Sequence, residues 1–108
     1  MKYWDVEFGD EARKDHRALD IHARVQVNKA IRKVSQNPLP QKEGGYGKPL
    51  GHKSGKNLTG LCKIKLLKLG IRVVYRIVRT EETMKIVVIA ARADDEVYSI
   101  AARRMELE

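Results

Sequence analysis

Two β-rich segments on either side of a single glycine constrain the fold of this chain more than any other feature. In residues 61–67 charged and apolar side chains alternate, so that Lys63 and Lys65 share one face of a strand and the apolar residues share the other. Residues 71–79 form the second segment, and Gly70 suits a turn between the two. The sequence therefore predicts a short β-hairpin with both lysines on one face.

The rest of the chain supplies further elements in a simple order. Residues 41–60 have six glycines, several lysines and no sustained period, which predicts a long, basic, glycine-rich loop. Asp10 and Asp94 stand where helix N-caps are expected. The predicted elements are a strand at 2–8, helices at 10–19 and 20–35, strands at 61–67, 71–79 and 84–91, and a helix that starts at 94. This order, β-α-α-β-β-β-α, indicates an α+β fold with helices packed on a small, mainly antiparallel sheet.

The second predicted helix has an apolar pattern that indicates which side of it is buried. Ile21, Val25, Ile31 and Val34 recur near helical spacing, and two prolines within residues 37–40 end the helix. We expect these four side chains to face the core.

Length and composition limit the class of protein. The 108 residues leave room for one modest core, so residues 1–108 are expected to form a single domain, with residues 105–108 as a tail whose Leu107-Glu108 end is typical of a cloning remnant. No segment approaches a membrane span, and the N-terminus lacks the order of a signal peptide. The lone Cys62 excludes an internal disulfide and fits a reducing compartment. These features predict a cytoplasmic protein.

The net charge of +8 is concentrated in the middle of the chain. Residues 21–80 contain fourteen Lys and Arg and a single acidic residue, Glu43, whereas residues 1–20 and 81–108 are both net negative. A basic segment of this density favours nucleic acid, an anionic membrane or an acidic protein as the partner, and charge alone does not choose among them.

Four cations and one phenol are candidates for a shared anion-binding surface. The candidates are Lys63, Lys65, Arg72, Arg92 and Tyr98. Taken singly, each such side chain is more often simply exposed or packed. Taken together, they would put repeated positive charge on one concave sheet surface without an acidic partner. A bound phosphate chain would relieve that repulsion, so the pattern indicates a polyanion site.

The same residues resemble the RelE branch of the RelE/ParE toxin superfamily. The resemblance rests on residues 61–66, the hairpin at 70–75, and Arg92 with residues 96–98, and the element order agrees. It implies a toxin of a bacterial type II toxin–antitoxin system that cleaves mRNA in the ribosomal A site. It also implies an acidic antitoxin as partner, no cofactor or metal, no membrane and no direct DNA partner.

The resemblance also implies functions for individual residues. The catalytic cations and tyrosine of the family fall on Lys63, Lys65, Arg72, Arg92 and Tyr98. Further contacts to RNA or ribosome are predicted at other basic positions, namely Lys48, Lys53, Lys56, Lys68 and Arg76. Three departures from the family pattern are Cys62 in place of an aromatic residue, Asp94 in place of a basic one, and a longer Gly/Lys loop at residues 44–57.

The implied chemistry needs no group beyond the RNA and these side chains. RNA carries its own nucleophile, the 2′-OH, and cleavage requires proton removal, stabilisation of a pentacoordinate phosphate and protonation of the 5′-oxygen. Tyr98 or Lys65 is the candidate base, and Arg92 is the candidate stabiliser of the leaving group. The expected products are a 2′,3′-cyclic phosphate or 3′-phosphate and a 5′-OH.

Two other classes of function remain open from the sequence alone. One is a DNA gyrase inhibitor of the ParE kind, which shares the fold but typically lacks the full set of five residues. The other is a non-catalytic RNA-binding or antitoxin-like module whose cations only neutralise phosphate.

Overall fold

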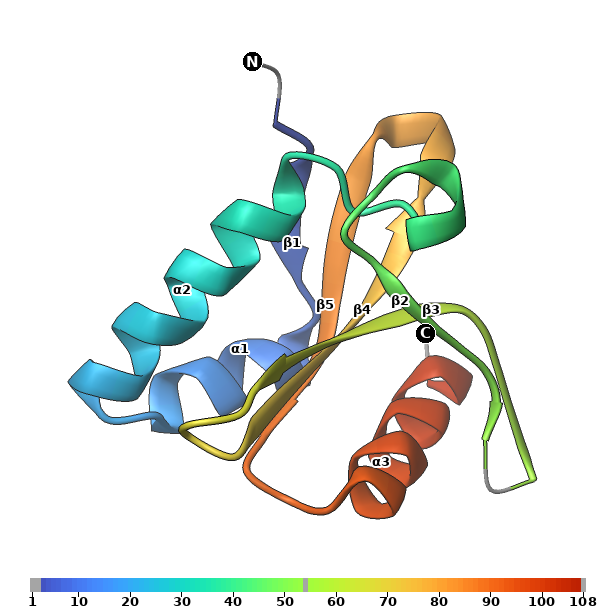
Figure 1. Ribbon diagram of the computed structural model, residues 1–108. Helices are drawn as coiled ribbons and strands as arrows, with labels where there is room; N and C mark the ends of the chain where they lie inside the picture. The colour runs from blue at the N-terminus through green and yellow to red at the C-terminus, as the bar shows by residue number, and fades with distance from the viewer. Residues whose placement is uncertain (1–2, 54, 108) are drawn as a thin grey trace.

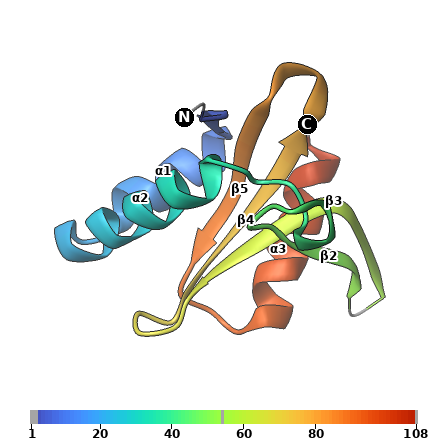
Figure 2. The same cartoon turned by 45° about the horizontal axis from the view of Figure 1, so that its top comes forward.

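The computed structural model describes residues 3–53 and 55–107, without the side chain of Lys53. Its elements form three layers, with α1 and α2 on one face of a five-stranded sheet and α3 on the other (Figures 1 and 2). In chain order they are β1 (Asp5–Phe8), α1 (Asp10–Ala18), α2 (Ile21–Ser35), the short 3-10 helix η1 (Gln41–Glu43), β2 (Lys48–Lys53), β3 (Lys56–Leu66), β4 (Ile71–Val78), η2 (Arg79–Glu81), β5 (Thr83–Ala90) and α3 (Asp94–Glu106). The predicted α+β class is confirmed.

The strands lie in the order β1-β5-β4-β3-β2. Neighbouring strands pair antiparallel except β1 and β5, which are parallel, so the sheet is mainly antiparallel as predicted. The chain leaves β1 through two helices and re-enters the sheet at the opposite edge, in β2. Three hairpins then cross the sheet until β5 reaches β1, which places the first and last strands side by side.

The prediction of a long loop over residues 41–60 is wrong. Most of this segment forms η1, β2 and the first part of β3, and the two strands pair antiparallel as a hairpin. Gly51 in β2 and Gly60 in β3 have positive φ and break the alternation of side chains that marks an ordinary strand. Leu50 and Leu58 are nonetheless buried on the α3 side of the sheet. The element order therefore contains one more strand than the sequence pattern indicated.

The sheet separates two apolar clusters, and this arrangement confirms the predicted strand parity. Cys62 is free and buried in the cluster beneath α1 and α2, together with Val73 and Tyr75. Lys63 and Lys65 lie on the other face and make contacts with α3. One face of β3 thus packs under α1 and α2, and the other carries Lys63 and Lys65 beside the buried Leu58 and Leu61.

The buried side of α2 is only partly as predicted. Ile31 and Val34 are buried, but Ile21 is 76% exposed and Val25 43% exposed, so their predicted burial is wrong. The buried hydrophobic residues of α2 are Ala23, Val27, Ile31 and Val34. The small side chain of Ala23 faces the sheet at the start of the helix, which turns the larger Ile21 and Val25 outward.

The predicted N-caps at Asp10 and Asp94 are also wrong. Each is the first residue of its helix, the caps are Gly9 and Ala93, and neither cap makes a side-chain hydrogen bond. The carboxylates remain near helix N-termini, where the helix dipole stabilises negative charge. Of the predicted tail at 105–108, the first two residues belong to α3, which continues to Glu106, and Glu108 lies outside the described residues.

The edge of β5 is completed partly by side chains. β1 pairs with β5 only along Thr83–Ile86. Beyond it, the Asp15 carboxylate of α1 accepts a hydrogen bond from the Ile89 backbone N–H at 3.0 Å, and the Arg104 guanidinium of α3 donates to the Val87 carbonyl at 2.8 Å. Arg104 and Asp15 also form an ion pair at 2.7 Å, which links the two helical layers past the strand edge.

None of the helices in the described part of the chain has the length and apolar content to span a bilayer.

Candidate active site

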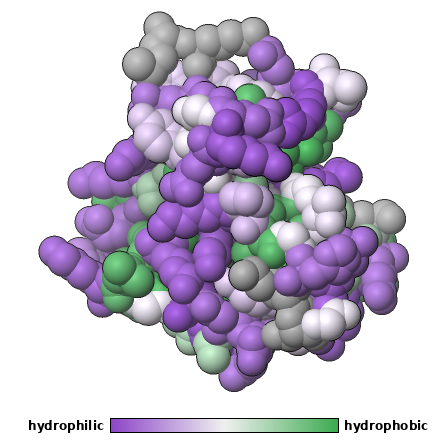
Figure 3. Space-filling model, turned by 45° about the vertical axis from the view of Figure 1, so that its right-hand side comes forward, coloured by the Kyte–Doolittle hydropathy of each residue, from purple (hydrophilic) through white to green (hydrophobic). Residues whose placement is uncertain are grey.

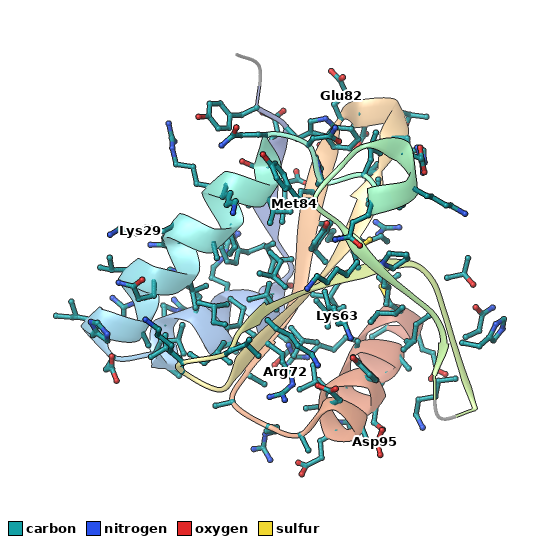
Figure 4. The ribbon with its side chains drawn as sticks, in the orientation of Figure 1. Lys29, Lys63, Arg72, Glu82, Met84 and Asp95 are labelled. Atoms are coloured by element: carbon teal, nitrogen blue, oxygen red, sulfur yellow. The ribbon has the colours of Figure 1, made fainter. Side chains whose placement is uncertain are left out.

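The β3–β4 hairpin places three of the predicted catalytic cations on one face of the sheet. Lys65 and Arg72 are direct cross-strand partners. Lys63 lies two residues before Lys65 on the same face of β3, and in β2 its cross-strand partner is Lys48. Cross-strand partners share a face, so positive charge is repeated over three adjacent strands. Figure 4 shows the side chains of Lys63 and Arg72 on the side of the sheet that α3 covers.

Helix α3 brings Tyr98 onto this face. Its ring packs in the apolar cluster under α3 and is only 4% exposed. The Lys63 ammonium donates a hydrogen bond to the Tyr98 hydroxyl at 3.2 Å and lies 5.8 Å from the ring centroid. The packed ring fixes the position of the phenol, and the phenol in turn holds Lys63.

Asp94 lies between two of the cations. Its Oδ2 is 3.1 Å from the Lys65 ammonium, and its Oδ1 accepts a hydrogen bond from Nε of Arg72. The expectation that this surface carries no acidic partner is therefore wrong. The first turn of α3 crosses the end of the β3–β4 hairpin, so a carboxylate at the start of that helix reaches both strands.

The pKa of the Asp94 carboxyl reflects these contacts. Partial burial alone would raise it, but hydrogen bonds and positive charge from Arg72 and Lys65 bring the pKa below its ordinary value. Asp94 is therefore ionised near neutral pH, and it offsets part of the positive charge on the surface.

Arg72 and Arg92 are held in different ways. The Arg72 guanidinium also donates to the backbone carbonyls of Gly70 at 3.2 Å and Arg92 at 2.9 Å. The Arg92 side chain is 60% exposed and pairs with Glu96 at 3.2 Å, one turn along α3. Arg72 thus ties the chain at Arg92 to the site, while the Arg92 guanidinium extends into solvent.

The predicted RNA contacts are spread over β2, β3, β4 and the β3–β4 turn rather than placed on one element. Lys48 and Lys68 are exposed, whereas Lys56 and Arg76 are half-buried, and the side chain of Lys53 lies outside the described part of the structure. The visible face around the β2–β3 hairpin and α3 is largely hydrophilic, with only small apolar patches (Figure 3). This surface is suited to a charged partner over a wide area.

Asp94 and Glu96 are site residues that sequence reasoning missed. Both follow closely after Arg92, at the start of the helix predicted to begin at 94. Their closeness to Arg92 was the only local signal, and it indicates the Arg92–Glu96 pair but not the contacts of Asp94 with the distant Lys65 and Arg72. Within residues 3–53 and 55–107, no group of three or more His, Cys, Asp or Glu is arranged to hold a metal ion.

The fold and the site together define a class, a small basic α+β protein with lysine and arginine side chains clustered on one face of its sheet. No family model matches the chain. A RelE-like toxin protein of Escherichia coli is 30% identical over 108 residues, which covers 97% of this chain and 99% of that protein. The mRNA interferase toxin RelE of E. coli K12 is 28% identical over 105 residues, with the same coverage. The chain belongs to the RelE-like toxin family.

Solved structures agree with this assignment. A mutant of the E. coli toxin RelE in the free state has a TM-score of 0.76 at 24% identity, covering 96% of this chain and 99% of that one, which shows the shared fold. The RelBE2 toxin–antitoxin complex from Mycobacterium tuberculosis gives a TM-score of 0.66 at 27% identity, covering 87% of this chain and 97% of that one.

Proposed function

We propose that this protein is the toxin of a type II toxin–antitoxin system and that it cleaves mRNA bound to the ribosome without a metal ion. One observation carries the proposal. Lys63, Lys65 and Arg72 share one face of the β3–β4 hairpin, and α3 adds a buried tyrosine that is hydrogen-bonded to Lys63. Several fixed cations beside a positioned hydroxyl group are what phosphodiester cleavage requires. The names of the relatives support the same activity.

The reaction uses the RNA 2′-OH as nucleophile. A bond forms between the 2′-oxygen and phosphorus, and the bond from phosphorus to the 5′-oxygen breaks. The 2′-OH proton passes to a base on the protein, and a proton is delivered to the departing 5′-oxygen. The products are a 2′,3′-cyclic phosphate and a 5′-OH. Lysine and arginine donors stabilise the added negative charge in the pentacoordinate transition state.

The contacts of the two candidate bases favour Tyr98 over Lys65. The Lys65 ammonium is ion-paired with Asp94, and a protonated lysine has no lone pair to accept a proton. The Tyr98 oxygen is held by a donor, Lys63, on the cationic face. We therefore assign Tyr98 to proton transfer, Lys63, Lys65 and Arg72 to charge stabilisation, and the exposed Arg92 to the leaving group.

The proposed partners are the ribosome with its mRNA and an acidic antitoxin in the cytoplasm. The basic positions Lys48, Lys53, Lys56, Lys68 and Arg76 are proposed contacts to RNA. The antitoxin is supported by the related RelBE2 toxin, which was solved as a toxin–antitoxin complex. The dense positive charge of residues 21–80 gives a physical reason for an acidic partner.

Mapping of RNA ends tests the activity. Purified protein is incubated with a defined mRNA, either alone or in a translating extract, and new 5′ ends are mapped. The reaction without extract is repeated with EDTA to remove metal ions. We expect cleavage that leaves 5′-OH ends, and loss of at least about 100-fold in rate when Lys63, Lys65 and Arg92 are all changed to alanine.

A matched control removes the same amount of charge elsewhere. Arg13, Lys14 and Lys29 lie on α1 and α2, on the other side of the sheet, and all three are exposed. Their triple alanine variant is expected to cleave like the unmodified protein. Cleavage that survives in the Lys63/Lys65/Arg92 variant, or that is absent in both settings, would contradict the nuclease. DNA damage that requires gyrase would instead support a gyrase inhibitor.

A further inference from the structure

Asp94 is placed where a phosphate would be expected to bind. Its two carboxylate oxygens each take a different donor, one from Lys65 on β3 and one from Arg72 on β4. Both donors are half-buried, and the Asp94 side chain is 36% exposed, so the three groups are reachable from solvent. A carboxylate that bridges two cations in this way has the charge and the spacing of an RNA phosphate oxygen pair.

We propose that Asp94 is a specificity-determining residue that occupies the anion position between Lys65 and Arg72 and must leave it when an RNA phosphate binds. The inference rests on the proposed function in one respect, since it takes RNA as the anion that binds these two cations. It adds that the unliganded site is filled by the protein's own carboxylate, so weak or isolated anions are rejected.

The contacts of Arg72 argue against a purely supporting role for Asp94. Arg72 is already held by two backbone carbonyls, those of Gly70 and Arg92, which fix its guanidinium without the carboxylate. Lys65 is held by its strand, directly opposite Arg72. Asp94 is therefore not needed to bring the two cations together, and its main effect is to neutralise them.

The position of Asp94 in α3 also argues against a purely structural role. A carboxylate at a helix start commonly accepts hydrogen bonds from backbone N–H groups of the first turn. In α3 the cap residue is Ala93 and makes no side-chain hydrogen bond, while the oxygens of Asp94 are directed across the sheet to Lys65 and Arg72. Asp95 and Glu96 add negative charge to the same turn, so the dipole of the helix is compensated without Asp94.

Binding to RNA that cannot be cleaved tests the inference separately from catalysis. A fluorescent single-stranded RNA with 2′-O-methyl groups lacks the attacking hydroxyl, so its anisotropy reports binding alone. Asp94→Asn keeps the shape of the side chain and removes its charge. We expect this variant to bind the RNA about fivefold more tightly, because two partly exposed ion pairs no longer compete with phosphate.

Two controls separate local competition from net charge. Asp10→Asn changes the charge by the same amount at the first residue of α1, and its affinity is expected to stay within about twofold of the unmodified protein. In a Lys65→Ala/Arg72→Ala background, Asp94→Asn is expected to give no gain. Thermal unfolding of each variant verifies that the fold is intact.

The outcomes distinguish the inference from the proposed function. Unchanged or weaker binding by Asp94→Asn, or an equal gain with Asp10→Asn, would overturn the role of Asp94 even if the protein cleaves mRNA. If neither the unmodified protein nor the Asp94→Asn variant bound the RNA, the role of Asp94 would also be overturned. Tighter binding by Asp94→Asn, in a protein that cleaves no RNA in any setting, would support the anion site and refute the nuclease.

Discussion

Two tyrosines on opposite faces of the sheet have hydroxyl groups in different surroundings. The Tyr98 hydroxyl accepts a hydrogen bond from the Lys63 ammonium on the charged face. The Tyr75 hydroxyl donates to the Pro38 carbonyl at 2.8 Å within the core under α1 and α2, and burial raises the pKa of Tyr75. Tyr98 thus has a place in the proposed chemistry, whereas Tyr75 holds the chain that follows α2 against the core.

Removal of the two hydroxyl groups is expected to have different results. Tyr98→Phe keeps the packed ring and should lower the rate of mRNA cleavage about 100-fold, because proton transfer is lost. Tyr75→Phe should leave that rate unchanged and reduce the free energy of unfolding by about 1 kcal/mol, because the Pro38 carbonyl loses its donor. Cleavage rates and urea unfolding of both variants measure the two effects. Equal cleavage by Tyr98→Phe and the unmodified protein would remove Tyr98 from the mechanism.

At the scale of elements, two helices meet past the end of a strand. β1 is too short to cover the whole edge of β5, and Asp15 and Arg104 bond the backbone beyond it. Both side chains are about one-fifth exposed, so their ion pair is shielded from water. The pair therefore stabilises the contact between layers and also blocks the open strand edge.

Loss of Arg104 should weaken this junction. Arg104→Met leaves the Asp15 carboxylate without its cation and the Val87 carbonyl without a donor, and we expect the free energy of unfolding to fall by roughly 2 kcal/mol. Urea denaturation measures the change. Lys14→Ala is the control, because its ion pair with Glu11 is mostly exposed and should contribute less than about 0.5 kcal/mol. A similar small loss in both variants would show that the Arg104 pair has no special role.

The elements also show which features of the fold the sequence could predict. The alternation around Lys63 and Lys65 correctly indicated the two faces of β3, because Cys62 packs under α1 and α2 while the two lysines face α3. β2 was missed because its pairing comes from backbone hydrogen bonds with β3, and glycines interrupt the side-chain pattern that marks a strand. The parallel pairing of β1 with β5 has no local signal at all, since it joins residues far apart in the chain. The ion pairs of Asp94 required the same kind of long-range information.

At the scale of the whole molecule, the basic middle segment does not form a single patch. α2 contributes Arg24, Lys29, Arg32 and Lys33, and this helix lies on the opposite side of the sheet from α3. Figure 4 shows Lys29 directed away from the sheet, far from Lys63 and Arg72. The protein thus presents positive charge on both sides of the sheet, from α2 on one side and from β3 and β4 on the other, which suits a partner that extends over more than one face.

Growth assays test the proposed antitoxin. Expression of this protein in bacteria is expected to arrest growth, and co-expression of an adjacent gene that encodes an acidic protein should relieve the arrest, because opposite charge favours tight association. The Lys63/Lys65/Arg92 alanine variant should not arrest growth, which ties the effect to the site. An unrelated acidic protein at the same level should give no relief. Arrest that no adjacent gene relieves would contradict the antitoxin.

The pairing of β1 with β5 determines when the sheet can close as the chain is synthesised. β1 is made before the other four strands of the sheet, but its neighbour β5 is made after all of them. Arg92 and Tyr98 follow later still, after β5. A nascent chain therefore carries the lysines of β3 long before it has the tyrosine or a closed sheet. The five residues of the proposed site are together only after Tyr98 has been made, so a nascent chain that ends at β5 lacks both Arg92 and Tyr98.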